Sequence, residues 1–290
     1  MSFSESAPEK LTAVIPICEP IEELVALSSL ISLIRHTLIK LVLVVDMKNY
    51  ETFEYLQDLT QDINNISVFH VNFGNPGETR EYGRQHVITE FICFWDSDDH
   101  PNISAILQVI ENSSADIDVY IGNYSLKFIN GKKPNVLVKH QENLEFIHLN
   151  PGVWRFIFRN ESILDAHFPP IRMGEDQIFL LETKLWEKNI AFVNKNFYDY
   201  SVGRAGQLTE TRSALVDLLP AFKLITSLHD DFRQNLATRY YSIVATRIYV
   251  SLIKRMPFSS IIKPSIFMIF HPSVLIMGAK IFFKHSRKRR

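Results

Sequence analysis

Continuous apolar runs alternate with amphipathic segments over the first 112 residues of the chain. The apolar runs are short, which indicates buried strands at 11–17, 41–46 and 91–95, and a further strand at 66–71. The intervening segments have the pattern of helices, which we expect at 21–34, 50–60, 78–89 and 101–112. Such alternation predicts right-handed βαβ crossovers and a parallel sheet covered on both faces. We therefore expect the α/β class, with a nucleotide-binding type of half-domain over residues 10–112.

The pattern changes after residue 112. Two β-rich runs flank Gly131-Lys132-Lys133-Pro134, which predicts a β-hairpin from 119–129 and 135–138. The further elements expected are a strand at 152–158, a helix at 174–188, a strand at 190–200 and a mostly helical segment over 212–255.

Three carboxylates follow the apolar run 91–95 within four positions, at Asp96, Asp98 and Asp99. Like charges this close repel, and a divalent cation relieves the repulsion. Oxygen ligands on a short loop suit Mg²⁺ or Mn²⁺, and open α/β sheets place ligands at the carboxyl ends of strands. The alternative is a polar turn in which Asp98 or Asp99 caps a helix that starts near Pro101.

Composition is that of an ordinary globular protein, with 46% hydrophobic and 22% charged residues. The only two cysteines, Cys18 and Cys93, lie in or beside predicted strands and are expected to be buried. They suggest no disulfide framework, which fits a reducing compartment.

The C-terminal region is both apolar and basic. Residues 251–290 hold nine of the 31 Lys and Arg side chains and none of the 32 acids. The stretch 261–283 is apolar, but its uninterrupted apolar part is shorter than a membrane-spanning helix needs. It also contains Pro272, which would break or kink a helix. We expect an interfacial segment whose basic residues are drawn to anionic lipid. The alternative is a helix pair packed on the rest of the protein, and a nucleic-acid role lacks a binding motif.

Five short motifs occur in a fixed order over residues 10–210. They are Val14-Ile15-Pro16-Ile17, Asp46 at the end of a strand, Thr79-Arg80-Glu81-Tyr82-Gly83, Trp95-Asp96-Ser97-Asp98-Asp99 and Gly174-Glu175-Asp176. In this order they resemble the family-2 glycosyltransferases of bacterial capsule, O-antigen and lipopolysaccharide biosynthesis. The chain departs from the family pattern at Cys18-Glu19, where a Tyr-Asn-type pair is usual, at Met47 in place of a second acid, and at Glu81 in place of Asn.

The resemblance implies a GT-A fold, which has a Rossmann-like, mostly parallel central sheet flanked by helices. It implies that Asp98, with Asp96 or Asp99, holds Mn²⁺ or Mg²⁺ on the diphosphate of a nucleotide-sugar. The residues that it places around this donor are Pro16, Ile17, Glu19, Asp46, Arg80, Asp96, Ser97 and Arg204. Of these, Asp46 would bind the base, and Arg204 would lie in a loop that closes over the diphosphate.

The resemblance makes Asp176 the catalytic base, with Glu175 beside it; the alternative is a pair of acids that the helix dipole favours. Trp154 would stack on an acceptor sugar, although a core Trp is the commoner explanation.

These inferences predict a catalytic domain over 1–210, with a nucleotide-binding half (10–112) and an acceptor half (113–210). Residues 211–290 form a helical C-terminal extension with a membrane-associating tail. The expected activity is inverting transfer of a hexosyl or N-acetylhexosaminyl group, most readily from a UDP-sugar, to a surface-polysaccharide or lipid-linked glycan. The expected location is cytoplasmic, peripheral on the inner face of the cell membrane, without nucleic-acid partners.

Two alternatives stay open at this point. A nucleotidyltransferase would also use metal carboxylates, but it would need a Gly-rich basic loop after the first strand, where the chain has Cys18-Glu19-Pro20-Ile21. A degenerate family member that serves as a scaffold subunit would account for the departures from the family pattern.

Overall fold

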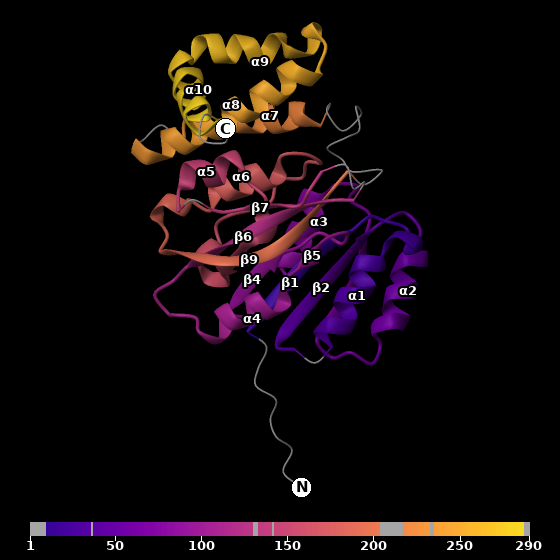
Figure 1. Cartoon of the computed structure of the whole chain (residues 1–290). Coiled ribbons are helices and arrows are strands. Elements are labelled where there is room, and N and C mark those ends of the chain that lie inside the picture. Colours follow the sequence, from indigo (N-terminus) through magenta and orange to yellow (C-terminus); the bar gives the residue numbers. More distant parts are fainter. Residues whose placement is uncertain are drawn as a thin grey trace. The chain divides into compact units, whose positions relative to one another are not determined.

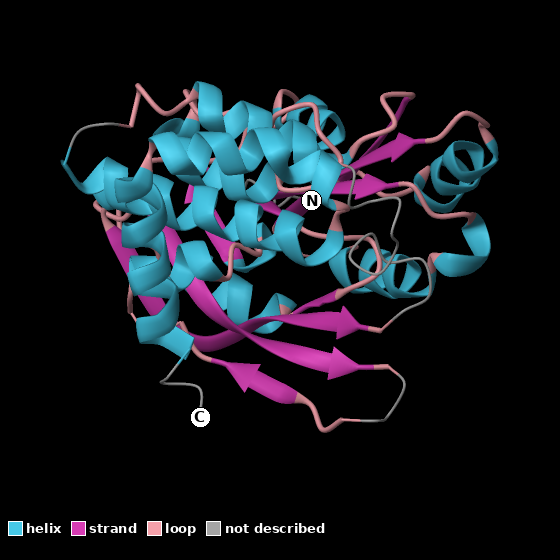
Figure 2. Ribbon diagram, turned by 90° about the horizontal axis from the view of Figure 1, so that it is seen from above, coloured by secondary structure: helices cyan, strands magenta, loops and turns pink. Residues whose placement is uncertain are grey.

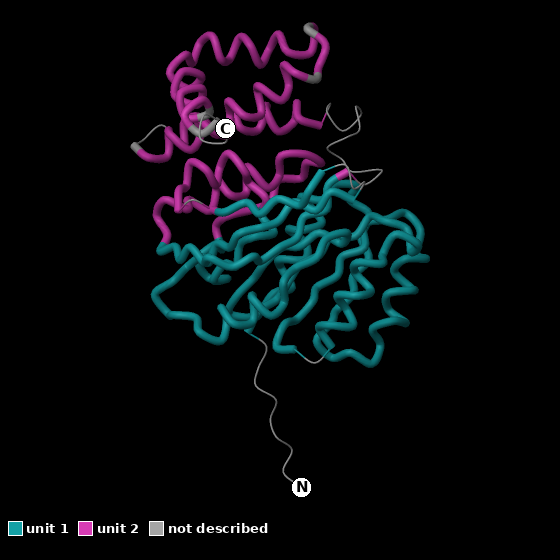
Figure 3. Tube along the Cα trace, in the orientation of Figure 1, with its two compact units in different colours: residues 1–139, 153–164, 189–202 teal, residues 140–152, 165–188, 203–290 magenta. Residues whose placement is uncertain are grey.

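The computed structural model describes residues 10–35, 37–129, 133–140, 142–203, 217–232 and 235–286. The chain divides into two compact units, shown in Figure 3. Unit 1 comprises residues 1–139, 153–164 and 189–202, and unit 2 comprises 140–152, 165–188 and 203–290. The boundary expected between residues 210 and 211 lies outside the described residues.

Unit 1 holds all the described strands, and Figure 1 labels them except β3 and β8. They are β1 (Leu11–Ile17), β2 (Ile39–Asp46), β3 (Ile66–Val71), β4 (Phe91–Phe94), β5 (His100–Pro101), β6 (Val119–Phe128), β7 (Val136–Val138), β8 (Phe156–Arg159) and β9 (Ile190–Val202). They form one sheet in the order β3-β2-β1-β4-β8-β6-β9-β5, and β7 pairs with β6 as the predicted hairpin. Figure 2 shows the strands in magenta among the helices.

The first four strands of the sheet run parallel, as the alternating pattern predicts. Strand β8 runs antiparallel to both β4 and β6, and β6 and β9 are again parallel. The expected strand at 152–158 is displaced along the chain, because residues Val153–Arg155 form a 3-10 turn (η2) before β8 begins.

The helices of unit 1 are α1 (Val25–Ile34), α2 (Glu51–Thr60), α3 (Pro76–Arg84) and α4 (Ile103–Glu111). The 3-10 turn η1 (Ile21–Glu23) precedes α1, and the 3-10 turn η3 (Asn160–Ile163) follows β8. Helix α3 begins two residues earlier than expected, because the Asn75 side chain accepts the Glu78 N–H and Pro76 occupies the first turn. Helix α4 is capped by Asn102, which accepts the Ala105 N–H at 3.1 Å. The alternative in which Asp98 or Asp99 caps this helix is therefore wrong.

Helices cover both faces of the parallel strands, because successive side chains of a strand point to opposite faces. Ala13 and Ile15 of β1 belong to the same core cluster as the buried residues of α1. Val14 points the other way, toward α3. A Cβ built on Gly83 of α3 would lie 2.5 Å from Val14 Cγ1, so the motif glycine allows this helix to approach the sheet.

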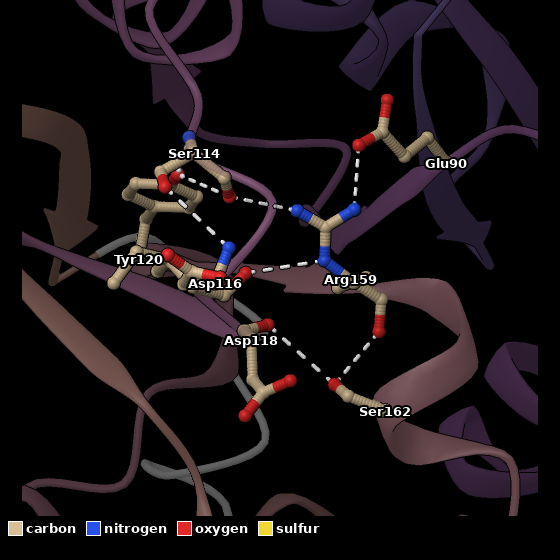
Figure 4. A network of polar contacts seen from close by, with 8 residues as sticks. Glu90, Ser114, Asp116, Asp118, Tyr120, Arg159 and Ser162 are labelled. Carbon is tan, nitrogen blue, oxygen red and sulfur yellow. Dashed lines mark hydrogen bonds and ion pairs between the residues drawn. The ribbon is translucent and has the colours of Figure 1, made fainter.

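Arg159 fastens β4 to its neighbours, as Figure 4 shows. Its guanidinium donates to Glu90 Oε1 at 2.5 Å, to the Ser114 carbonyl at 2.9 Å and to the Ile117 carbonyl at 3.2 Å. It also lies over the Phe91 ring, 4.9 Å from the centroid. This network fixes the start of β4, the strand that leads to the carboxylate loop.

Unit 2 is helical in its described part. Its helices are α5 (Leu144–Leu149), α6 (Glu175–Glu182), α7 (Leu218–Ser227), α8 (Asn235–Arg255), α9 (Phe258–Phe270) and α10 (Pro272–Ser286), with the 3-10 turn η4 (Leu185–Glu187). Ile178 and Leu181 of α6 share one core cluster with α7 and α8. Leu144 and Leu149 of α5 pack against the same cluster, so segments 140–152 and 165–188 belong with the C-terminal helices.

The apolar tail forms two helices that bend sharply at His271. Within the described residues, no single helix is long and apolar enough to cross a membrane. Ser259–Phe270 and Pro272–Ile281 meet that criterion only together, and they are bent by 96°. Pro272 thus ends one helix and opens the next, as expected for a residue that cannot continue a helix.

Candidate active site

The carboxyl ends of β1 and β4 are neighbours in the sheet, which brings two motifs of the sequence together. Ser97 Oγ donates to Glu19 Oε2 at 2.7 Å, and the Cys18 N–H donates to the same oxygen at 3.1 Å. Pro16 and Ile17 occupy the last two positions of β1. Glu19 is thus the partner of Ser97 across the two strand ends.

Arg80 and Asp96 form an ion pair beside this contact. Arg80 Nη2 lies 2.6 Å from Asp96 Oδ1, and the Arg80 side chain is only 8% exposed. Arg80 is thus a buried side chain that holds the first acid of the carboxylate loop. The Asp96 N–H donates to the Tyr198 hydroxyl at 2.9 Å, so β9 braces the same loop.

Asp99 is the most buried member of the carboxylate cluster. Its Oδ1 accepts the Ser201 N–H at 2.7 Å, while Oδ2 is buried without a hydrogen-bond partner among the described residues. The pKa of Asp99 is raised to about 9, chiefly by burial and then by the charges of Asp96 and Asp98. The Ser201 N–H and the Tyr198 hydroxyl act against this rise, although the hydroxyl does not complete a hydrogen bond to Oδ2.

Cys18 is exposed, so the prediction that it is buried is wrong, whereas Cys93 is buried as expected. Protein atoms nevertheless limit hydration of the Cys18 thiol, and this is the largest cause that raises its pKa to about 12. The charges of Glu19, Asp46, Asp98 and Asp96 contribute, in decreasing order. The charges of four carboxylates thus act on a single thiol, so negative charge is concentrated at this end of the sheet.

This negative cluster fits a divalent cation only with help from a ligand. Among the described residues, no three His, Cys, Asp or Glu side chains are arranged as a ready metal-binding group. Asp96 is occupied by Arg80, and one oxygen of Asp99 by Ser201. The unpartnered Asp99 Oδ2 and the repulsion within the cluster favour a cation, whose remaining ligands would be phosphate oxygens and water.

Asp46 holds the loop between β3 and α3. Its two carboxylate oxygens accept the N–H groups of Phe73, Gly74 and Asn75 at 2.7 to 3.1 Å. The Thr79 hydroxyl lies 2.9 Å from Oδ2. The strand-end acid is thus largely engaged by the protein itself, and it positions the loop that leads to Arg80.

Trp154 belongs to an aromatic group in unit 1. Its ring stacks with Tyr198 and Tyr200 of β9, with centroids 4.7 and 5.4 Å apart, and meets Tyr124 of β6 edge-on at 4.7 Å. Trp154 is half-buried, so part of its surface stays open to solvent.

Glu175 and Asp176 open helix α6 in unit 2, after Gly174 with φ +88°. A glycine suits this left-handed conformation, and a Cβ there would also lie 3.2 Å from Ala221 Cβ. Asp176 Oδ1 accepts the N–H of Gln177 at 2.7 Å. Arg204 lies outside the described residues.

Sequence reasoning missed the contributions of β9. Tyr198 and Ser201 support Asp96 and Asp99 although they are about a hundred residues away in the chain. Nothing in their local sequence signals this, since the pairing of β5 with β9 brings them to the loop.

Open α/β sheets bind their ligands at the carboxyl ends of the strands, which is where this acidic loop and Arg80 lie. The family model described as Glycosyl transferase family 2 matches residues 13–176, more than half of the chain. The chain therefore belongs to glycosyltransferase family 2, and its mixed α/β sheet with a C-terminal helical region agrees with the expected GT-A fold.

Solved structures with the same fold include S. aureus TarS 1–349 in complex with UDP-GlcNAc. The likeness has a TM-score of 0.58 at 16% identity and covers 96% of this chain and 92% of that one. The mannosyltransferase PcManGT from Pyrobaculum calidifontis, in complex with GDP-Man and Mn²⁺, has a TM-score of 0.53 at 10% identity and covers 96% and 88%. At these identities the likeness concerns the fold alone. No curated protein sequence matches the chain.

Proposed function

We propose that this family-2 glycosyltransferase moves a hexosyl or N-acetylhexosaminyl group, with inversion, from a UDP-sugar to a surface-polysaccharide or lipid-linked glycan. One observation carries the donor-site assignment. Glu19, Ser97, Arg80 and the carboxylates 96–99 meet at the carboxyl edge of β1 and β4, where α/β sheets place nucleotides. TarS with UDP-GlcNAc, which shares the fold, supports the choice of donor class.

Each residue of the donor site has a role that follows from its contacts. Asp98, which is half-buried, and the unpartnered oxygen of Asp99 would hold Mn²⁺ or Mg²⁺. A divalent cation, when bound, neutralises the charge that develops on the departing nucleoside diphosphate. Arg80 keeps Asp96 oriented through the buried ion pair, so Asp96 faces the donor with one oxygen fixed. Asp46 acts on the base through the loop that it holds.

Asp176 is the proposed general base, next to Glu175. The acceptor hydroxyl attacks the anomeric carbon, the bond to the diphosphate breaks, and the hydroxyl proton passes to the Asp176 carboxylate. Trp154 offers its exposed part to the acceptor sugar, and Arg204 serves as a charge partner of the diphosphate. The basic, apolar tail would hold the enzyme on the inner face of the cell membrane, close to a lipid-linked acceptor.

The first experiment is a thermal-shift screen of the purified chain with UDP, GDP, CMP and common nucleotide-sugars, each with and without Mn²⁺. A ligand that binds only the folded state raises the melting temperature by mass action. We expect a Mn²⁺-dependent shift with UDP and UDP-sugars that Asp98→Ala abolishes. Asp176→Asn should keep the shift but lose sugar transfer; if both variants transfer normally, the assignment is wrong.

A scaffold subunit that does not catalyse transfer is the second candidate. It is favoured by the engagement of Asp46 and Arg80 with other protein groups, and by the lack of a three-ligand metal group in the described residues. A nucleotide shift without hydrolysis or transfer under any condition would select it.

A further inference from the structure

Helices α8 and α10 of unit 2 cross at very short distance. A Cβ built on Gly278 would lie 2.2 Å from Thr246 Oγ1 and 2.4 Å from the Ser242 carbonyl oxygen. Val274 and Ile281, at helical spacing from Gly278, are buried on the same side of α10. The C-terminal half of α10 therefore lies beside the first turns of α8.

A groove of about 440 Å³ runs between these two helix ends. Its lining residues are Leu236 and Arg239 of α8, with Met277, Lys280, Ile281 and Lys284 of α10. Three of these six side chains are cationic and the other three are apolar. Such a groove suits a ligand that is both anionic and apolar.

A buried carboxylate holds two of the cations in place. Glu145 of α5, with a side chain only 6% exposed, is paired with Arg239 Nη2 and with Lys284 Nζ at 3.3 Å. Because Lys280 lines the same groove, the described residues place three positive charges there beside the one negative charge of Glu145. The excess positive charge favours an additional anion, and a phosphate could accept hydrogen bonds from the guanidinium and the two ammonium groups.

Exposed apolar side chains continue from the groove along the helices. A second depression of about 720 Å³ shares Lys280 and Lys284 and is lined also by Ile276, Ala279 and Phe283. Ile276 and Phe283 are 53% and 64% exposed. On α9 a similar exposed stripe recurs at the helical spacing of 262, 266, 269 and 270, where every residue is Ile or Phe.

We propose that this groove binds the phosphate of an anionic phospholipid headgroup, with the acyl chains along Ile276 and Phe283. The inference deepens the proposed membrane attachment and rests on it. The proposed site is a defined groove, in contrast to a general attraction of basic residues to the membrane. Glu145 is a positioning residue that keeps Arg239 and Lys284 side by side. The apolar flank and the absence of any acid in residues 251–290 favour a lipid surface over a soluble anion.

The test is co-sedimentation of the full chain with vesicles of phosphatidylcholine alone or mixed with phosphatidylglycerol. The key variant is Lys280→Glu, because Lys280 lies in the groove but outside the Glu145 ion pairs. The matched control is Lys223→Glu, an exposed lysine on α7 with the same change of charge. Each cation near an anionic membrane surface strengthens binding to it. Replacing a lysine there with a glutamate is therefore expected to weaken vesicle binding about thirtyfold.

We expect binding only to the mixed vesicles, a loss of about thirtyfold in Lys280→Glu, and a much smaller loss in Lys223→Glu. Ile276→Ser should also weaken binding. Equal losses in the two Glu variants would mean non-specific attraction, and equal binding to pure phosphatidylcholine would mean apolar adsorption; either result overturns the site. A third result would also overturn the site. In it, inorganic phosphate raises the melting temperature of the natural chain but not of Lys280→Glu, while the chain binds both kinds of vesicle equally.

A nucleotide thermal shift on the same variants separates this inference from the proposed function. If Lys280→Glu still responds to UDP and Mn²⁺, loss of vesicle binding reports on the groove alone. If no variant responds to any nucleotide while vesicle binding follows the expected pattern, the donor assignment fails and the lipid site stands.

Discussion

Asp46→Asn would distinguish two roles for the acid at the end of β2. In the structure its carboxylate receives three backbone N–H groups of the 73–75 loop and lies beside the Thr79 hydroxyl. Asparagine keeps one acceptor oxygen, which can face Phe73 and Gly74. Its NH₂ group would then face the Asn75 N–H, which loses its acceptor, whereas the Thr79 hydroxyl can donate to the Asn75 carbonyl and accept from the NH₂ group.

The magnitude follows from the bond that is lost. A hydrogen bond to a charged group contributes about 1.5–3 kcal/mol, and the one lost is that from the Asn75 N–H. We expect the free energy of unfolding to fall by about 2 kcal/mol, which lowers the melting temperature by roughly 3 °C in a protein of this size.

Urea denaturation and thermal melting measure the effect, and Asp58→Asn on the exposed face of α2 is the control for loss of one charge. If Asp46 positions the loop, Asn weakens all nucleotides alike and lowers stability. If Asp46 instead reads the base directly, stability stays at the level of the control and the preference among UDP, GDP and CMP changes. The second result would refute the role assigned here.

Three further predictions concern packing and charge. Gly83→Ala should lower the free energy of unfolding by about 1–3 kcal/mol, because the new methyl group meets Val14 on β1. Urea titrations measure this, and an unchanged midpoint of unfolding would contradict the close approach of α3 to β1. Gly278→Ala should destabilise the helical unit by a similar amount through contact with Thr246, which far-UV circular dichroism with urea can follow. Because the pKa of Asp99 is raised from 3.8 to about 9, folding takes up a proton between these values, and stability of the metal-free protein should fall as pH rises through this window. Asp99→Asn should remove that slope, so its stability relative to the natural chain should increase from pH 5 to pH 9; a constant difference would show that Asp99 is already ionised.

The pattern of the sequence was sufficient for the α/β class and for most element positions. Continuous apolar runs predicted β1, β2 and β4 because a strand buried on both faces has no polar side to interrupt it. The apolar run 91–95 placed the carboxylate loop at the end of a strand, which is β4, and the family match confirms the family resemblance. Cap chemistry was less visible, since Asn102 rather than an aspartate begins α4.

Only the tertiary structure decided how the motif residues are used. Arg80 pairs with Asp96, Glu19 with Ser97, and Asp46 with a loop, and each contact joins the ends of different strands or helices. Local spacing cannot specify such pairs, because the sheet order brings together residues that are 16 to 78 positions apart. The burial of Asp99 and the groove between α8 and α10 have the same origin. Periodicity fixes which face of each element is apolar, and packing fixes which charged groups then meet.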